Sequence, residues 1–492
     1  MTLLGIDLGT TGVKATLAQA DGSFITAAYR PYVAISEEVQ ELDPLKIWNQ
    51  TKSVLQEVAQ VSPEPIIGLS ISSFGESFVL LDEADKPLMN TLLYADERGS
   101  TEAKELEQKF GKSRLQQVTG LSVNKSYSLS KLLWIKKEWP TLFAKIASFM
   151  PISTFIYYQL SGVKAVDYSL AARTYLLNYR EKIWDTDLVT YVGLSEAVFP
   201  KLVEIGKIFG QISDERAHEL GLNPGIQLVM GGHDQVCCAI GSGVCKEGQA
   251  LDGMGTVDCI TPLFQLDTVD SQQMLAKGYA CVPYQQNLYT TYAYIYDGGA
   301  LTKWFRKHYE WYEDFNQLEA HFSKEPSTVY VLPHFSGAAT PYQDDAACGL
   351  IYGLTTQTTR HTIYQAILEG IAFEMNINLE QLEQAGIMID EIIASGGGSQ
   401  SDKWLQIKAN IYNKPVSQLV VKESGTMGVI LLAGVATGVM PSLEEAMTKN
   451  CHRQQTFYPQ KAQVHAYQES FKIYKRLYHA QMVIRKGAGM WD

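Results

Sequence analysis

The sequence predicts an α/β protein built from two related domains. Two short Gly/Thr turns, at residues 7–12 and 252–256, carry this prediction, because each interrupts an apolar segment that resumes after it. Gly9 and Gly255 lie 246 positions apart (255 − 9), half of the 492-residue length. A chain of this length is also too long for one ordinary core. We therefore expect domains at 1–247 and 248–492, although a chance similarity between two short turns is the alternative.

The amino-acid composition indicates which classes of binding partner can be excluded. Hydrophobic residues make up 46% of the chain and charged residues 19%, which is typical of a folded globular protein. The net charge of −12 comes without a basic stripe, and this argues against nucleic acid as a partner. The seven cysteines form no C-x-x-C pair, which favours reduced thiols. With no signal peptide and no membrane-length apolar run visible, we expect a cytoplasmic protein without a membrane partner.

The first turn combines the groups that a phosphate site needs. An apolar strand runs into Asp7, whose carboxylate can hold a metal ion through water. Gly9 and Gly12 let the backbone approach a ligand and take positive φ, and Thr10 and Thr11 add hydroxyl donors. A strand follows these glycines, so the motif is a hairpin and not a P-loop, in which a helix would follow. A hairpin without any ligand is the structural alternative.

The rest of the first half alternates strands and helices. A β-meander is expected through about residue 33. A helix then begins at Asp43-Pro44, which supplies an N-cap and a proline in the first turn. Buried strands are expected at 66–72 and 78–81, and helical segments at roughly 100–160. This order places the polar residues after 72 at the end of a buried strand.

The second half contains a glycine-rich strand–turn–helix. A buried strand at 391–395 is followed by three glycines, 396–398, and by a helix at 401–413. Consecutive glycines leave a shelf without side chains on which adenine or ribose can lie. The segment is not a dinucleotide fingerprint, because Ser401 replaces the last glycine. A further helix at 425–438 is dense in Gly and Ala, so we expect it to pack tightly against a neighbour.

Asp234 is the candidate catalytic residue. It follows the strand 227–230 on a Gly-Gly-His-Asp-Gln turn, where a carboxylate can face a ligand with little obstruction. Such a carboxylate can accept the proton of a hydroxyl that attacks phosphorus. The alternative is a turn aspartate bonded to its own backbone, and the two phosphate-type turns favour the catalytic interpretation. His233 has no nucleophile elbow to complete a triad, so we expect a structural role for it.

At this point the chain resembles the FGGY carbohydrate kinases, within the sugar kinase/Hsp70/actin superfamily, over nearly its whole length. The motifs that carry the resemblance are Asp7-Leu8-Gly9-Thr10-Thr11-Gly12, Ser130-Lys131-Leu132-Leu133-Trp134, Asp167-Tyr168-Ser169-Leu170-Ala171, Gly232-His233-Asp234-Gln235, Gly253-Met254-Gly255-Thr256, Asp297-Gly298-Gly299-Ala300, the segment 332–341, and the triple glycine with Ser401 and Trp404. Each is weak alone, but together and in this order they are specific. The resemblance is to a xylulokinase-like member of uncertain substrate.

The resemblance implies two RNase H-like (actin-like ATPase) domains with an interdomain active-site cleft. It implies that the N-terminal domain holds mainly the sugar and the C-terminal domain mainly ATP. Asp234 matches the catalytic base, and Asp7 and Asp234 match the carboxylates near Mg²⁺. The positions that match nucleotide-side groups, or that flank them, are Thr10, Thr11, Lys14, Gly255, Thr256, Gly299, Lys303, Gly397 and Ser401.

The sugar side is where the sequence departs from its relatives. Glycerol kinases carry Arg-Glu where this chain has Gly75-Glu76, and Ser126 falls where they place a tyrosine, so glycerol is an unfavourable substrate. Glu76 can still accept two hydroxyl bonds, which suits a ketose or a linear polyol. The further substrate candidates are Ser77, Asp96, Arg98, Asp234 and Gln235. The segment 337–340 lacks the charged pair common at this point of the family.

The predicted function is ATP-dependent phosphorylation of a hydroxyl on a small sugar or polyol, with a ketose such as a pentulose favoured. ATP and Mg²⁺ are the expected cofactors, and a homodimer is compatible with the sequence. Two alternatives remain at this point. One is an actin- or Hsp70-like ATPase switch, and the other is a non-catalytic sugar-sensing regulator. The polar Glu76 segment argues against the first, and retention of the base and both turns argues against the second.

Overall fold

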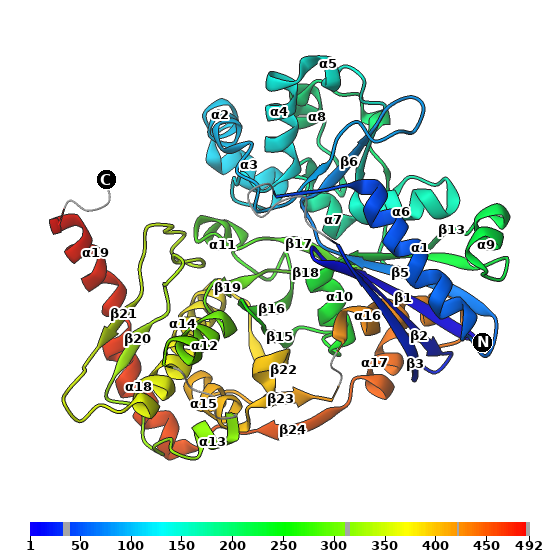
Figure 1. The fold of residues 1–492 in the computed structure, drawn as a ribbon. Helices are drawn as coiled ribbons and strands as arrows, with labels where there is room; N and C mark the ends of the chain where they lie inside the picture. The colour runs from blue at the N-terminus through cyan, green and yellow to red at the C-terminus, as the bar shows by residue number, and fades with distance from the viewer. Residues whose placement is uncertain (33–39, 310–314, 421–422, 489–492) are drawn as a thin grey trace. The chain divides into compact units, whose positions relative to one another are not determined.

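The computed structural model describes residues 1–32, 40–309, 315–420 and 423–488, which pack as two compact units (Figure 1). Unit 1 comprises residues 1–243, 281–289 and 423–451, and unit 2 comprises 244–280, 290–422 and 452–492. Packing therefore groups two segments, 281–289 and 423–451, with unit 1, whereas the sequence placed both in the second domain.

Unit 1 is organised around a mixed sheet, which has six strands among the described residues, in the order β13-β14-β5-β1-β2-β3. β5 pairs in parallel with β1 and β14, whereas β1 with β2, β2 with β3 and β13 with β14 are antiparallel. The expected meander is confirmed as far as Pro31, and residue 33 lies outside the described residues. The strands of unit 1 are β1 (Thr2–Leu8), β2 (Gly12–Gln19), β3 (Phe24–Pro31), β4 (Glu41–Leu42), β5 (Ile66–Ser73), β6 (Phe78–Leu81), β7 (Thr91–Leu92), β8 (Ser148–Pro151), β9 (Ala165–Asp167), β10 (Leu177–Asn178), β11 (Ile183–Trp184), β12 (Lys201–Val203), β13 (Ile208–Gln211), β14 (Gln227–His233) and β17 (Val282–Gln285), with most of β18 (Leu288–Thr290).

Helices cover this sheet and extend the unit. α1 begins as expected, since the Asp43 carboxylate accepts a hydrogen bond from the Leu45 N–H at 2.9 Å and Pro44 occupies the first turn. Its apolar side, including Trp48 and Leu55, is buried in the core of unit 1. The helices of unit 1 are α1 (Pro44–Gln60), α2 (Ser100–Phe110), α3 (Lys112–Thr119), α4 (Ser128–Glu138), α5 (Pro140–Phe143), α6 (Ile152–Ser161), α7 (Tyr168–Ala172), α8 (Thr186–Val192), α9 (Asp214–Leu220), α10 (Asp234–Gly241), α16 (Ser424–Ala436) and α17 (Leu443–Asn450), with a 3-10 turn at Glu196–Val198.

Backbone contact between α10 and α16 explains why the segment 423–451 belongs to unit 1. A Cβ atom on Gly428 would lie 2.0 Å from the Cys237 carbonyl oxygen, and one on Gly241 would lie 1.9 Å from that of Ser424. α16 also reaches the sheet, because a Cβ atom on Gly5 of β1 would lie 2.9 Å from the Thr426 carbonyl oxygen. The tight packing predicted for this Gly/Ala-rich helix is confirmed, and its partners are the first strand and the Asp234 helix.

Unit 2 repeats the central sheet of unit 1. Its strands run in the order β19-β16-β15-β22-β23-β24, with β15 parallel to β22 and β22 parallel to β23. The β15–β16 hairpin thus takes the place that β1–β2 takes in unit 1, next to a parallel strand. The internal repeat inferred from the spacing of Gly9 and Gly255 is therefore confirmed by topology, and both units have an RNase H-like strand order.

The helices of unit 2 include one long buried element, α14, whose residues are buried over much of its length. The strands are β15 (Gly248–Met254), β16 (Asp258–Gln265), β19 (Ala293–Ile295), β20 (Tyr330–Leu332), β21 (Leu350–Tyr352), β22 (Ile389–Ser395), β23 (Val416–Leu419) and β24 (Arg453–Phe457). The helices are α11 (Ser271–Ala276), α12 (Gly299–His308), α13 (Phe315–Glu319), α14 (Arg360–Gln384), α15 (Asp402–Tyr412), α18 (Lys461–Tyr474) and α19 (Leu477–Ala488), with a 3-10 turn at Gly397–Gln400. In the part of the chain that the structure describes, no helix is long and apolar enough to cross a membrane.

Candidate active site

The β1–β2 hairpin ends in a short turn that presents the predicted threonines. Thr10 is half-buried and Thr11 is exposed, while the Gly9 N–H donates to the Gly12 carbonyl oxygen at 3.0 Å and closes the turn. Lys14, opposite Asp7 in the β1–β2 register, forms an ion pair with Glu423 at 2.6 Å. The turn is therefore accessible, as a phosphate-binding turn must be, and Lys14 is anchored by the residue that precedes α16.

The expected positive φ at Gly9 and Gly12 is wrong, because neither glycine lies in the left-handed region. Gly12 is instead required by close packing, since a Cβ atom there would lie 2.5 Å from the Tyr29 hydroxyl and 2.6 Å from the Arg30 carbonyl oxygen of β3. Glycine is therefore needed at position 12 because β3 packs closely against it, and not because the backbone has a positive φ there.

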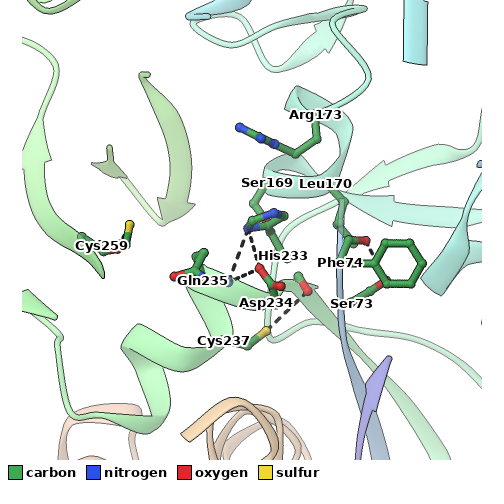
Figure 2. A network of polar contacts seen from close by, with 12 residues as sticks. Ser73, Phe74, Ser169, Leu170, Arg173, His233, Asp234, Gln235, Cys237 and Cys259 are labelled. Carbon is green, nitrogen blue, oxygen red and sulfur yellow. Dashed lines mark hydrogen bonds and ion pairs between the residues drawn. The ribbon is translucent and has the colours of Figure 1, made fainter. Parts of the chain in front are cut away.

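Asp234 is the first residue of α10, directly after β14 (Figure 2). Its Oδ1 accepts a hydrogen bond from the Gln235 N–H at 2.6 Å and lies 3.2 Å from Nδ1 of His233. About 36% of the Asp234 side chain is exposed, compared with 8% for His233. A carboxylate fixed at a helix start and open to solvent on one side is the geometry that a general base needs.

Burial and like charge shift the titration of the two predicted carboxyl groups. Burial raises the pKa of Asp234 to about 6, against the opposing effects of the Gln235 N–H and Arg173. Burial likewise raises the pKa of Asp7 to about 6, and neighbouring Asp234 raises it further. The charge of Asp234 thus disfavours the charged form of Asp7, and a bound cation would relieve this repulsion. The residue pair named from the sequence is therefore brought together.

His233 has the structural role expected from the sequence, through a chain of contacts that the sequence did not reveal. Its backbone N–H donates to Ser169 Oγ at 2.9 Å, and Ser169 in turn donates to the buried carboxylate of Asp167. A Cβ atom on Gly232 would lie 2.9 Å from Cδ1 of Ile205 and 3.0 Å from Ser169 Oγ, so glycine leaves room for these side chains. Burial, together with Arg173, lowers the pKa of His233 to about 3, and its ring is neutral at physiological pH.

Glu76 occupies an unusual backbone position. Its φ is 64°, and the Ser77 N–H donates to the Gly75 carbonyl oxygen at 2.7 Å, which makes residues 75–77 a tight three-residue turn. A residue with a side chain is strained in this region by roughly 1–3 kcal/mol and persists only where its surroundings hold it. Only 7% of the Glu76 side chain is exposed. The predicted substrate residue is thus held in a strained turn at the end of β5.

Arg173, which the sequence analysis missed, is the partner of Glu76. Its Nε donates to Glu76 Oε1 at 2.6 Å, and Nη2 donates to the same oxygen. The guanidinium lies over the Tyr127 ring, 5.1 Å from the centroid. The two ion-pair partners are 97 residues apart in the chain, and no local pattern could have connected them.

Asp96 and Arg98 are also bonded to each other. Arg98 Nε donates to Asp96 Oδ1 at 2.8 Å and Nη2 to Oδ2 at 2.6 Å, and Nη2 also pairs with Glu41 at 2.6 Å. Fully buried Lys131 carries favourable charge interactions with Asp96 and Glu76, although burial lowers the pKa of its ammonium to about 8. Lys131 therefore links the two predicted substrate segments electrostatically.

The predicted nucleotide residues of unit 2 gather around the β15–β16 turn. Gly255 and Thr256 are exposed, and their carbonyl oxygens accept hydrogen bonds from the Gly299 N–H at 2.8 Å and the Ala300 N–H at 3.1 Å. A Cβ atom on Gly299 would lie 2.4 Å from the Gly255 carbonyl oxygen, so glycine is required. Lys303 is exposed on the same helix, α12.

The glycine shelf lies beside this turn. A Cβ atom on Gly396 would lie 2.8 Å from the Met254 carbonyl oxygen at the end of β15, whereas one on Gly397 would meet open space. Ser401 differs from the prediction that it faces the nucleotide. Its hydroxyl accepts from the Trp404 N–H at 3.0 Å and donates to Glu319, and the residue is buried. Its contacts make it the N-cap of α15.

A buried charge cluster lies beneath the second hairpin. Lys408 Nζ contacts Asp252 Oδ2 at 2.7 Å and Asp258 Oδ2 at 2.8 Å, and all three side chains are 0% exposed. Burial and neighbouring Asp252 hold the pKa of Asp258 well above its usual range. The two aspartates flank the turn of residues 255–257, and Lys408 comes from the middle of α15. The cluster therefore connects the turn to the helix that follows the shelf, a connection that the sequence did not predict.

Among the described residues, no group of three or more His, Cys, Asp or Glu side chains is arranged to hold a metal ion. Asp7 and Asp234 are two hard oxygen ligands, and Mg²⁺ commonly uses one or two protein carboxylates together with substrate phosphates. The residues present therefore fit a Mg²⁺ ion that arrives with a nucleotide.

Comparison with known proteins identifies both halves of the chain. Residues 2–241 match the N-terminal domain, and residues 254–437 the C-terminal domain, of the FGGY family of carbohydrate kinases. These matches agree with the resemblance carried by the motifs. They support the kinase prediction, and they give no support to the ATPase-switch or regulator alternatives.

Individual relatives extend over nearly the whole chain. The xylulose kinase of Bacillus subtilis (strain 168) is 29% identical over 484 residues, which cover 97% of this chain and 96% of the relative. The gluconokinase of Bacillus licheniformis is 26% identical over 90% of each chain. The crystal structure of a xyloylose kinase from Brucella ovis superposes with a TM-score of 0.91 at 26% identity, over 98% of this chain and all of that one.

Proposed function

The chain belongs to the FGGY family of carbohydrate kinases, and from this premise we propose that it transfers the terminal phosphoryl group of ATP to a hydroxyl of a small sugar or polyol, with a pentulose favoured. The observation that carries the proposal is the pair Asp7 and Asp234 at the ends of β1 and β14. The names of relatives that act on xylulose support the pentulose.

Asp234 is the proposed base. It accepts the proton of the attacking sugar hydroxyl while the new O–P bond forms and the bond from phosphorus to the ADP oxygen breaks. Two features support this role. The carboxylate is open on one side, and its pKa of about 6 leaves it ionised at neutral pH yet basic enough to take a proton.

Nucleotide binding is proposed for the turns and the shelf. In unit 1, Thr10, Thr11 and Lys14 offer hydroxyl and ammonium donors at the first turn. In unit 2, the residues around the second turn and the shelf offer a surface with few side chains; they are the exposed Gly255, Thr256, Lys303 and Gly397 and the half-buried Gly299. Ser401 contributes by capping α15, which begins directly after the shelf.

Asp7 and Asp234 would hold Mg²⁺, which neutralises phosphate charge when it is bound with ATP. On the sugar side, Glu76, Ser77 and Gln235 are proposed to orient the substrate hydroxyls. Asp96 and Arg98 support this region through their contact with each other. We also propose a cytoplasmic location, which is supported by seven cysteines that form no disulfide bond in the described structure, and a homodimer.

The decisive experiment compares the wild-type protein with Asp234→Asn. ADP release is measured with ATP, Mg²⁺ and a panel of ketoses, alditols and aldonates. We expect sugar-dependent ADP release in the wild type and at least a roughly 100-fold lower kcat in the variant, with ATP binding retained. Near-normal turnover of Asp234→Asn would remove this residue from the base role. ADP release that does not depend on any sugar would contradict the kinase proposal.

A further inference from the structure

The contacts around Glu76 identify a specificity device that involves Arg173. Nε and Nη2 of Arg173 both donate hydrogen bonds to Oε1 of Glu76. Adjacent Ser77 is 2% exposed, and its Oγ has no hydrogen-bond partner in the described structure. A buried hydroxyl without a partner, next to a carboxylate that is held in place, indicates a missing polar ligand.

The turn that carries Glu76 is held from both sides. Ser128 Oγ, at the start of α4, donates to the Glu76 carbonyl oxygen at 2.7 Å. On the other side, the Arg173 guanidinium holds the carboxylate. Because a strained backbone persists only when its surroundings fix it, these contacts define where the Glu76 carboxylate points.

Arg173 is fixed as firmly as Glu76. Its guanidinium lies on the Tyr127 ring, which stacks on Tyr175 with a centroid separation of 5.2 Å and an interplanar angle of 8°. Only 16% of the Arg173 side chain is exposed. A planar guanidinium held by a ring and a carboxylate loses little further freedom when it binds a hydroxyl.

The pair also adjoins the proposed base. A Cβ atom on Gly75 would lie 2.9 Å from the His233 ring and 3.0 Å from Cγ of Arg173, so these side chains fill the space beside Gly75. Figure 2 shows the His233 ring between Arg173 and Asp234. His233 lies 3.2 Å from Asp234 on its other side. The ion pair and the base are thus parts of one surface of unit 1.

The balance of charge on this surface is negative. The charges of Arg173 and Lys131 are balanced by those of Glu76 and Asp96. The His233 ring is neutral, and Asp7 and Asp234 contribute the remaining negative charge. A substrate carboxylate placed here would meet a guanidinium that is already neutralised and an aspartate of like sign. Like charges in contact cost several kcal/mol, and hydroxyl groups avoid this penalty.

We propose that Arg173 and Glu76 act as one neutral unit that binds substrate hydroxyls and selects uncharged ketoses and alditols against aldonates. This inference rests on the proposed kinase function and specifies its substrate class. Both substrate classes occur within this family, since relatives with similar sequence identity to this chain are named for xylulose and for gluconate. Arg173 is a specificity-determining residue in this scheme, and Glu76 supplies the acceptor.

The test uses the full-length protein and measures kcat/KM for matched five- and six-carbon ketoses, alditols and aldonates, with ADP release as the readout. For the wild type we expect a preference for the uncharged substrates of at least about 100-fold. In Glu76→Gln the guanidinium loses its counter-charge. We expect the aldonate-to-alditol ratio of kcat/KM to rise at least about tenfold. The control Glu57→Gln, which breaks a surface pair with Arg30, should leave this ratio unchanged.

The variant Arg173→Met provides a second, independent test of the proposal. We expect the KM for the uncharged substrate to rise at least about tenfold while the KM for ATP changes less than about twofold, with partial recovery in Arg173→Lys. An unchanged sugar KM in Arg173→Met, or an unchanged substrate ratio in Glu76→Gln, would overturn the inference while leaving the kinase function intact. If neither variant folds, wild-type turnover of an aldonate as fast as its alditol would overturn it. A wild type that phosphorylates no member of the panel would instead reject the proposed function itself.

Discussion

Replacing Lys408 should destabilise unit 2 more than any loss of a surface ion pair. The ammonium contacts Asp252 and Asp258 at 2.7 and 2.8 Å, and all three side chains are 0% exposed. Lys408→Met leaves a buried negative charge without a partner, and such a change costs about 3–5 kcal/mol.

The assay is differential scanning calorimetry at neutral pH. For a unit of about 200 residues, 1 kcal/mol corresponds to about 2–4 °C, so the transition of unit 2 should fall by roughly 6–20 °C. The matched control is Lys414→Met, because Lys414 pairs with Glu383 at 2.6 Å but the two side chains are 18% and 33% exposed. We expect the control to lose less than about 1 kcal/mol.

The dependence on pH distinguishes this explanation from simple loss of packing. The pKa of Asp258 is already raised by burial, and loss of the Lys408 ammonium, which lowers that pKa, raises it further. The folded variant therefore binds this proton more tightly than the unfolded chain does. The stability deficit of Lys408→Met should therefore shrink as the pH falls from about 8 towards 5. A deficit equal to that of the control, or one that does not change with pH, would refute the reasoning.

Three further outcomes are expected. Because the pKa of Asp234 is raised to about 6 and the base must be ionised, kcat/KM should be constant near pH 8 and fall as the pH drops through 6; a flat ADP-release profile down to pH 5 would contradict this. Ser169→Ala removes the acceptor of the His233 N–H, so kcat should fall while the KM for ATP stays constant in steady-state assays, and an unchanged kcat would exclude a positioning role. Gly397→Ala adds a methyl group into open space, so the melting temperature should not change while the ATP affinity measured by calorimetry falls. Gly428→Ala should instead lower the melting temperature, because its Cβ atom would lie 2.0 Å from the Cys237 carbonyl oxygen. Unchanged ATP affinity in the first variant, or unchanged melting in the second, would contradict these assignments.

Structural features that depend only on residues close together in the sequence were predicted correctly. The two hairpins, the start of α1 at Asp43 and the position of Asp234 after a buried strand each depend on a few consecutive residues. The repeat of Gly9 at Gly255 predicted two related domains, and the structure places each hairpin beside a parallel strand of a similar sheet.

Features that depend on distant residues were not predicted. Arg173 reaches Glu76 across 97 residues, and Lys408 reaches Asp252 across 156, with no local pattern to connect them. The function of Gly12 was misjudged for a related reason, since the restriction comes from Tyr29 on β3 and not from the turn itself. Ser401 was assigned to the nucleotide because its role as an N-cap is visible only with Trp404 and Glu319 in place.

The way α16 completes unit 1 has a consequence for biosynthesis. The ribosome releases residues 1–243 long before it makes Gly428, whose backbone packs against Cys237. Until α16 has been synthesised, the face of α10 that α16 contacts in the folded protein stays exposed on the nascent chain. Chaperones can bind this face, and it can also take part in misassembly. The proposed catalytic aspartate therefore gains its finished surroundings only late in translation, which ties the onset of enzyme activity to near-complete synthesis of the chain.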